Sequence, residues 1–311
     1  QALQIADDRG VTEHCGHEPI RIVIGKRGQC RKRDDRKERE SFVHDDHRRG
    51  LFFLSPNAST LPFAWQTRGC MTDKRLSFDG AERRRIYLFR HGAVDYVDDD
   101  GNVVADPDAV PLNQRGQAEA DAMREMFDDV AIDTALCSGL RRTRETGERV
   151  LAGRDVVLGI NAGFEEIRPA RERQPDFDLF RDVAYSHWYA GEAGRRFLGG
   201  ERYQDFYDRI ANTMEDVVAD SDWHNLALFA HGGTNAAVLG WVTGMGLTAF
   251  GVVDQATCCL NVIDFDVDRE NGSVLRKIVR GMNITANDPT KSLRHSGDME
   301  LLARYLAQFQ S

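Results

Sequence analysis

The sequence predicts an α/β fold, a three-layer sandwich in which a mostly parallel sheet is flanked by helices. First, short apolar runs typical of buried parallel strands alternate with segments of helical periodicity. Second, two of the apolar runs end in the same way, at Arg90-His91-Gly92 and at His231-Gly232-Gly233. Third, two late strand-like segments suggest an antiparallel strand at one edge. A hydrophobic share of 41% is enough to bury a core around such a sheet.

The expected elements follow one another from about residue 85. An apolar run at 86–89 predicts the first strand, and apolar residues at helical spacing predict a helix over 113–129. A second strand at 132–137 precedes a helix that Ser138 is expected to cap. Apolar runs of the same kind predict further strands at 156–160, 226–230, 260–265 and 274–279. Apolar residues at helical spacing predict further helices at 203–217 and 234–242.

Charge is unevenly distributed along the 311 residues. Residues 1–70 contain 13 Lys and Arg against 10 Asp and Glu, whereas residues 71–311 contain 28 against 40. The net negative charge of residues 71–311 repels a nucleic-acid backbone, so no nucleic-acid partner is expected. No stretch approaches the ~18 consecutive apolar residues of a membrane-spanning helix, so no membrane partner is expected. Six cysteines without a CxxC pair, and no visible secretory signal, predict a cytoplasmic protein with reduced thiols.

Two parts of the chain are expected to differ from the folded body. Residues 31–40, RKRDDRKERE, form the kind of charge run that is usually solvated and disordered, and the first methionine is Met71. We therefore expect residues 1–80 to be a poorly ordered N-terminal extension or upstream translation, and residues 81–311 to be the folded domain. Within it, the Arg-rich and irregular segment 163–200 is expected to form a variable cap. The Cys and His residues near the N-terminus fit no standard zinc spacing, so no metal is expected.

The two histidine-glycine motifs predict one shared site. Ligands of open α/β sheets lie beyond the carboxyl ends of the strands, where helix N-termini also point. Glycine after each histidine lets the backbone approach a ligand closely. The imidazoles of His91 and His231 are therefore expected to converge on one pocket, with Arg90 beside the first.

These motifs, in this order, resemble those of the histidine phosphatase superfamily, the phosphoglycerate-mutase-like proteins, over roughly residues 85–279. Between the two histidine motifs lies SGLRRTRET at 138–146, which is similar to the family's Ser-x-Leu-x-Arg-x-x-Gln-Thr segment, with Glu145 in place of the usual glutamine. Phe164-Glu165-Glu166 is similar to the family's Leu-x-Glu segment. The resemblance implies that residues 81–311 form a histidine phosphatase-like catalytic domain.

The resemblance implies a role for each of five residues. His91 is the histidine that becomes transiently phosphorylated, and Arg90, Arg142 and His231 are the phosphate-binding residues. Glu166 is the acid that protonates the leaving group and then accepts a proton from the attacking water. The chemistry is consistent with these roles, because an imidazole is nucleophilic only when it is neutral and nearby arginines disfavour its protonation. An arginine can also bind two phosphate oxygens at once, and no metal or other cofactor is required.

Three interpretations depend on which way a side chain faces. Arg142 is favoured over its neighbour Arg141, and Glu166 over Glu165, because a shift of one residue changes the side chain that reaches the site. The remaining arginines of the cap segment form either a basic lid over an anionic substrate or a solvated face. These arginines are Arg168, Arg171, Arg173, Arg181, Arg195 and Arg196.

The expected function is hydrolysis of phosphomonoesters, without a metal, through a phosphohistidine. The substrate class is a small phosphorylated metabolite; neither its identity nor the oligomeric state is predicted. Phosphoglycerate mutases usually continue Arg-His-Gly with Glu-Ser-x-x-Asn, whereas this chain has Val97 at the asparagine position. That difference favours a phosphatase over a mutase. The alternatives are a phosphoglycerate mutase and a noncatalytic phospho-ligand-binding protein of the same fold.

Overall fold

The computed structural model describes residues 80–96, 104, 106–170, 178–220 and 222–308. The chain divides into two units, 1–68 and 69–311, and all the described residues belong to the second. The N-terminal extension expected at 1–80 therefore lies outside the described residues, except for Gly80. No helix in the described ranges is long and apolar enough to cross a membrane.

A six-stranded sheet forms the centre of the described unit, with strand order β3-β2-β4-β1-β5-β6. The strands are β1 (Ala81–Arg90), β2 (Thr134–Cys137), β3 (Leu158–Ile160), β4 (Asn225–Ala230), β5 (Leu260–Asp268) and β6 (Val274–Ile284). Strands β1, β2, β3 and β4 run parallel, whereas β5 is antiparallel to both β1 and β6. The predicted fold class, with its antiparallel edge, is confirmed.

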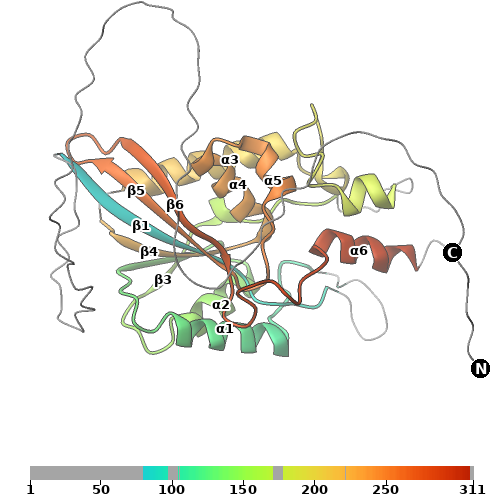
Figure 1. The fold of residues 1–311 in the computed structure, drawn as a ribbon, viewed down its shortest axis with the longest axis horizontal. Helices are drawn as coiled ribbons and strands as arrows, with labels where there is room; N and C mark the ends of the chain where they lie inside the picture. Colours follow the sequence, from blue (N-terminus) through green and yellow to red (C-terminus); the bar gives the residue numbers. More distant parts are fainter. Residues whose placement is uncertain (1–79, 97–103, 105, 171–177, 221, 309–311) are drawn as a thin grey trace, which may run out of the picture. The chain divides into compact units, whose positions relative to one another are not determined.

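Helices cover both faces of this sheet. They are α1 (Gln114–Met126), α2 (Arg141–Val150), α3 (Tyr203–Ala219), α4 (Gly232–Thr243), α5 (Ala249–Val252) and α6 (Asp298–Ala307). Helices α1 and α2 lie on one face, and α3, α4 and α5 lie on the other (Figure 1). Short helical turns complete the unit, at η1 (Ala162–Phe164), η2 (Leu179–Ala184), η3 (Phe197–Gly199) and η4 (Gly246–Thr248).

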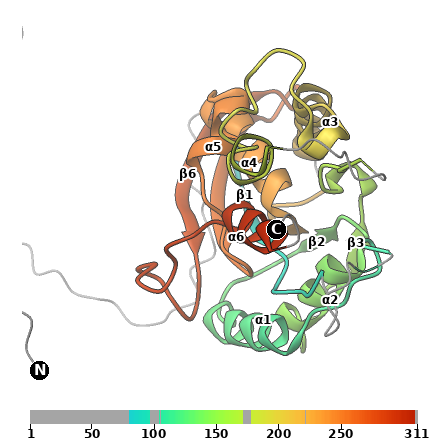
Figure 2. The same cartoon turned by 90° about the vertical axis from the view of Figure 1, so that its right-hand side faces the viewer.

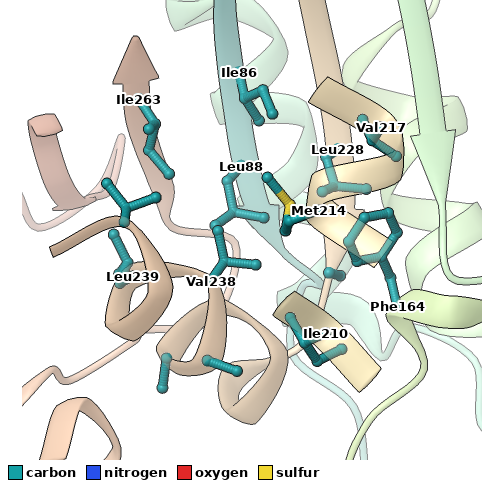
Figure 3. Packing of buried hydrophobic residues seen from close by; sticks show 14 of the residues in the cluster. Ile86, Leu88, Phe164, Ile210, Met214, Val217, Leu228, Val238, Leu239 and Ile263 are labelled. Atoms are coloured by element: carbon teal, nitrogen blue, oxygen red, sulfur yellow. The ribbon is translucent and has the colours of Figure 1, made fainter. Parts of the chain in front are cut away.

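Each face of the sheet packs against its own hydrophobic core. Ile86 and Leu88 of β1 pack with Met214 of α3 and Val238 of α4 (Figure 3). Phe89 belongs to the opposite core. Successive side chains of a strand point to opposite faces, so a strand covered on both sides is apolar without interruption. This explains why the apolar runs before His91 and His231 are continuous.

Three details of the sequence prediction are wrong. Strand β1 begins at Ala81 rather than at 86, because its polar first half is paired: Arg83 and Arg85 form ion pairs with Asp266 and Asp264 of β5. Ser138 does not cap the following helix, whose N-cap is Leu140. Helix α6 was not predicted, although Asp298 and Glu300 in its first turn and Arg304 in its last turn are charges typical of helix ends.

Candidate active site

The sheet brings the two histidines together. Strands β1 and β4 are parallel neighbours, and Arg90 lies opposite Ala230 in the register. The backbone N–H of His91, just beyond β1, donates to the carbonyl of Ala230, 3.0 Å away. The two imidazole centroids are 5.3 Å apart, and both side chains are buried. The predicted convergence of His91 and His231 at the carboxyl ends of two strands is therefore observed.

One hydrogen bond fixes which nitrogen of His91 is available. Nδ1 of His91 lies 2.8 Å from the carbonyl oxygen of Gly92, which can only accept, so Nδ1 carries the proton. In the neutral ring this leaves a lone pair on Nε2. The Gly92 backbone is itself held, because its N–H donates to Oγ1 of Thr146 on α2. Helix α2 therefore helps to orient the imidazole whose Nε2 could attack an electrophile.

His231 is held from the other side by Ser138, at the end of β2. Its Nε2 lies 2.8 Å from Oγ of Ser138, and that oxygen lies 3.0 Å from Oγ1 of Thr143. Nδ1 of His231 is buried and has no hydrogen-bond partner among the described residues. A buried polar atom without a partner is costly, so a polar ligand at this nitrogen would be stabilising.

The environment keeps both histidines neutral. Burial lowers the pKa of His91 well below its usual value, and the charges of Arg90 and Arg142 lower it further. Burial also lowers the pKa of His231 well below its usual value, and the charge of Arg142 lowers it further. A neutral imidazole is the form that can act as a nucleophile, so the resting site already has His91 in that form.

Two arginines contribute the positive charge of the site. Arg90 ends β1, and its Nη1 donates to the carbonyl of Gln255 at 2.5 Å. Arg142 lies in the first turn of α2, is 4% exposed, and donates to the carbonyl of Pro107 at 2.9 Å. Its neighbour Arg141 instead forms an exposed ion pair with Glu145. Of the two arginines, Arg142 is therefore the buried one, and its role in phosphate binding stays a prediction.

Of the two consecutive glutamates, Glu166 is the one beside the histidine motifs. Its carboxylate accepts backbone N–H groups from Gly233 at 2.9 Å and from Thr234 at 3.1 Å, in the first turn of α4. It also accepts the N–H of Ile167 at 3.0 Å. The N-terminus of a helix favours a negative charge, so α4 fixes this carboxylate next to His231. Glu165 pairs with Arg168 instead.

The described arginines of the cap segment are engaged locally. Arg181 pairs with Glu192 and Arg195 pairs with Asp182, both within the segment. Arg196 donates to the carbonyl of Gly200. Arg168 and Arg181 are exposed, as a solvated face requires, whereas the side chain of Arg195 is only 15% exposed. Arg171 and Arg173 lie outside the described residues.

The sequence interpretation missed three residues that hold the site. Ser138, which the sequence predicts as a helix cap, contacts His231 instead, and Thr146 supports the His91-Gly92 peptide. Both belong to the 138–146 motif, so the motif itself was a usable signal. The third, Asp298 in α6, forms an ion pair with Arg90, and nothing in its local sequence pointed to the site.

The model of the histidine phosphatase superfamily (branch 1) matches residues 86–277, well over half of the chain. The chain belongs to this superfamily. The matched range contains both histidine motifs, Arg142 and Glu166, and ends within β6. The family recognised from the motifs is therefore confirmed.

Individual relatives are distant. The chain is 26% identical over 187 residues to the adenosylcobalamin/alpha-ribazole phosphatase of Escherichia coli (strain K12), covering 58% of this chain and 90% of the relative. It is 22% identical over 235 residues to the 2-carboxy-D-arabinitol-1-phosphatase of Triticum aestivum, covering 70% of this chain and 44% of the relative. The chain thus spans less than half the length of this plant relative and of another from Arabidopsis thaliana.

Solved structures show the same fold. The alpha-ribazole phosphatase of Shigella flexneri aligns with a TM-score of 0.51 at 24% identity, over 64% of this chain and 96% of that one. A mycobacterial glucosyl-3-phosphoglycerate phosphatase aligns with a TM-score of 0.51 at 19% identity, over 65% and 99%. At these identities the likeness concerns the fold.

Proposed function

We propose that this chain hydrolyses phosphomonoesters through a phosphohistidine on His91, without a metal. The observation that carries the proposal is the pair of buried imidazoles, 5.3 Å apart, with Arg90 and Arg142 close enough to lower the pKa of His91. Cationic and neutral N–H donors around one nucleophile suit a tetrahedral anion. Family membership supports the same reaction class.

In the proposed first step, Nε2 of His91 attacks phosphorus and the bond from phosphorus to the ester oxygen breaks. Arg90, Arg142 and His231 bind the phosphoryl oxygens, where negative charge is spread during the transfer. Glu166, in its acid form, gives a proton to the departing oxygen. The buried Nδ1 of His231, which lacks a partner among the described residues, is the atom proposed to donate to the phosphoryl group, once the bound anion has led this imidazole to take up a proton.

In the second step, a water molecule attacks phosphorus and the bond from phosphorus to Nε2 breaks. Glu166, now a carboxylate, takes a proton from this water. Inorganic phosphate leaves and His91 returns to its neutral form. The three backbone N–H groups that hold Glu166 keep its carboxylate in one place through both steps.

The proposed substrate class is a small phosphorylated metabolite. The relatives are named as phosphatases of compounds of that kind, including 2-carboxy-D-arabinitol-1-phosphate and alpha-ribazole phosphate. Cytoplasmic location stays a proposal, and the free, buried Cys137, Cys258 and Cys259 are consistent with a reducing compartment.

The test is hydrolysis of an aryl phosphate by the full chain, in the presence of a chelator, with wild type, His91→Ala and His224→Ala compared. His224 is half-exposed and pairs with Glu82, so it serves as a matched control. We expect hydrolysis by wild type and His224→Ala and none above background by His91→Ala. A radiolabelled substrate should leave an acid-labile label on the wild type. Equal hydrolysis by all three proteins would contradict the assignment of His91.

Two further measurements, binding of inorganic phosphate and turnover of 3-phosphoglycerate, separate the two alternatives. A noncatalytic phospho-ligand-binding protein would bind inorganic phosphate without hydrolysing any phosphomonoester. A phosphoglycerate mutase would interconvert the isomers of phosphoglycerate faster than it releases phosphate. With 3-phosphoglycerate as substrate, we expect phosphate release or no reaction, and no isomerisation.

A further inference from the structure

Helix α6 begins beside the candidate active site, although its first residue, Asp298, follows His91 by more than 200 residues in sequence. In Figure 2, which faces the end of the sheet where α6 lies, this helix is seen in front of β1, between α4 and the layer of α1 and α2. Its first residue, Asp298, forms an ion pair with Arg90, with 2.5 Å between Oδ2 and Nη2. The C-terminal helix therefore contacts a proposed phosphate-binding residue directly.

The two terminal nitrogens of the Arg90 guanidinium are both engaged. Nη2 contacts Asp298, and Nη1 donates to the carbonyl of Gln255. Nε is buried without a partner among the described residues. Nε lies toward the start of α4, since a Cβ placed on Gly232 would come within 3.4 Å of it. The nitrogen without a partner thus faces the His231-Gly232 turn, where the phosphate is proposed to bind.

The carbonyl that accepts from Arg90 is itself held in place. Oε1 of Gln255 accepts from Nδ2 of Asn261 at 2.7 Å and from Nδ2 of Asn235 at 3.0 Å. Asn235 lies on α4 and Asn261 on β5, so two elements fix the loop that carries this carbonyl. One side of the guanidinium therefore rests on a rigid partner.

The other partner of Arg90, Asp298, is held in place by a second arginine, Arg294. Oδ1 accepts from Nη2 of Arg294 at 3.2 Å, and Arg294 also binds Asp254 through two hydrogen bonds of 2.7 and 2.9 Å. Burial raises the pKa of Asp298, but the charges of Arg90 and Arg294 outweigh burial and bring it to about 2. The carboxylate is therefore ionised at neutral pH, and it shares Arg294 with Asp254.

We propose that Asp298 is a positioning residue for phosphate binding, acting through Arg90. The carboxylate and the Gln255 carbonyl together fix the terminal nitrogens, so that Nε already points toward the phosphate. Binding then costs less side-chain entropy, because the Arg90 rotamer is fixed in advance. The two carboxylates, Asp254 and Asp298, face two guanidiniums, Arg90 and Arg294, so the four side chains together carry no net charge that would repel a phosphate. The inference rests on the proposed function for the identity of the ligand, a phosphate group.

The experiment measures the dissociation constant of inorganic phosphate by calorimetry, using the full chain. The variants are Asp298→Asn, Arg90→Ala and the two combined. Glu300→Gln is the matched control, since Glu300 lies in the same helical turn but accepts from the backbone of Gly297. An ionic hydrogen bond to a half-exposed carboxylate should be worth about tenfold in affinity. We expect Asp298→Asn to weaken phosphate binding by that factor, and Glu300→Gln to leave it unchanged.

The combined variant tests whether the effect passes through Arg90. We expect Asp298→Asn to cause no further loss once Arg90 is alanine, because the group it positions is gone. Tighter phosphate binding by Asp298→Asn would mean that the carboxylate competes with phosphate, which overturns the proposal. Independent, additive losses, or an equal loss in Glu300→Gln, would also overturn it. Thermal unfolding of every variant is recorded, and Asp298→Ser replaces Asp298→Asn if the latter does not fold.

Failure of the proposed function gives a different result. Phosphate binding needs no turnover, so a wild type that binds phosphate but hydrolyses no ester contradicts the proposed function alone. A wild type that hydrolyses esters while Asp298→Asn binds phosphate normally contradicts the inference alone. A wild type that binds no phosphate contradicts both.

Discussion

Two adjacent glutamates illustrate how strongly environment decides the role of a residue. Glu165 and Glu166 have the same chemistry, but Glu165 pairs with Arg168 whereas Glu166 accepts the N–H groups of Gly233 and Thr234. The backbone after Phe164 directs only the second carboxylate to the start of α4. A proton donor must be within reach of the reacting atoms, so Glu166 is the candidate that geometry supports.

Replacing Glu166 with glutamine should slow the reaction in proportion to the need for a proton on the leaving group. With alkyl phosphates, which are poor leaving groups, we expect turnover to fall by at least about 100-fold. With nitrophenyl phosphate the loss should be only a few-fold, because that leaving group departs without a proton. Glu165→Gln is the control and should resemble wild type with both substrates. Equal slowing with both esters would move the acid role to another residue.

Gly233 is required where it stands because the Glu166 carboxylate occupies the space beside it. A Cβ at Gly233 would lie 2.4 Å from Oε1 of Glu166, closer than any ordinary contact. Gly233→Ala should therefore displace Glu166 and lower kcat/KM by about tenfold or more. Gly191→Ala, where nothing lies within 4 Å of the new methyl group, should leave kcat/KM unchanged. Steady-state kinetics of the two variants tests this expectation.

At the scale of elements, the site is built from the ends of strands and the starts of helices. His91 follows β1, Ser138 follows β2, and His231 follows β4, which are parallel neighbours in the sheet. Helices α2 and α4 begin shortly after β2 and β4, and their first turns supply Arg142 and the N–H groups that hold Glu166. Parallel topology is the reason that residues far apart in sequence lie at one edge.

The N-cap of helix α1 should contribute to the stability of the fold but not to the proposed activity. Oδ1 of Asn113 accepts the N–H of Gly116 at 2.8 Å, and α1 contributes no proposed catalytic group. Asn113→Ala should lower the free energy of unfolding by about 1 kcal/mol. Arg144→Ala, an exposed replacement on α2, should change it by less than about 0.5 kcal/mol. Urea denaturation measures both, and kcat at 25 °C should remain near wild type in each.

At the scale of the whole molecule, burying two neutral histidines makes stability depend on pH. The pKa of His91 and the pKa of His231 both lie below their usual value when the chain is folded, chiefly because of burial. In the unfolded chain each histidine has a pKa near 6.5. Below that pH the unfolded chain takes up protons that the folded protein does not, so acid favours unfolding.

We therefore expect the stability from these two groups to be fully present above about pH 7 and to fall as the pH drops below about 6.5. The slope is about 1.4 kcal/mol per pH unit for each histidine. Urea denaturation at pH 7.5, 6.0 and 5.0 should show this loss in wild type. His91→Gln/His231→Gln should lack the part due to these two groups and keep the part due to buried His187, whose pKa burial lowers to about 4, and the control His224→Gln should retain all of it. A wild type and a double variant with the same pH dependence would contradict the expectation.

The sequence by itself determined which residues follow the buried strands. His91 and His231 each follow an apolar strand, and a motif that carries Arg142 lies between them in the chain. These are local patterns, and parallel strands place their ends together without further information. The structure buries Arg142 and exposes Arg141, and it places Glu166 rather than Glu165 at the start of α4, while the roles of Arg142 and Glu166 stay predictions. Substrate choice was not determined, since the cap segment contains no comparable pattern.

Only the tertiary structure decided the contacts made across elements. Ser138 contacts His231 rather than the helix that follows it, and Asp298 reaches Arg90 from the last helix of the described chain. The N-terminal half of β1 is likewise a strand because Arg83 and Arg85 find Asp266 and Asp264 on β5. The physical reason is the same in each case. A polar side chain is stabilised by whichever partner the fold brings within hydrogen-bond distance, and sequence spacing carries no information about a partner more than 90 residues away.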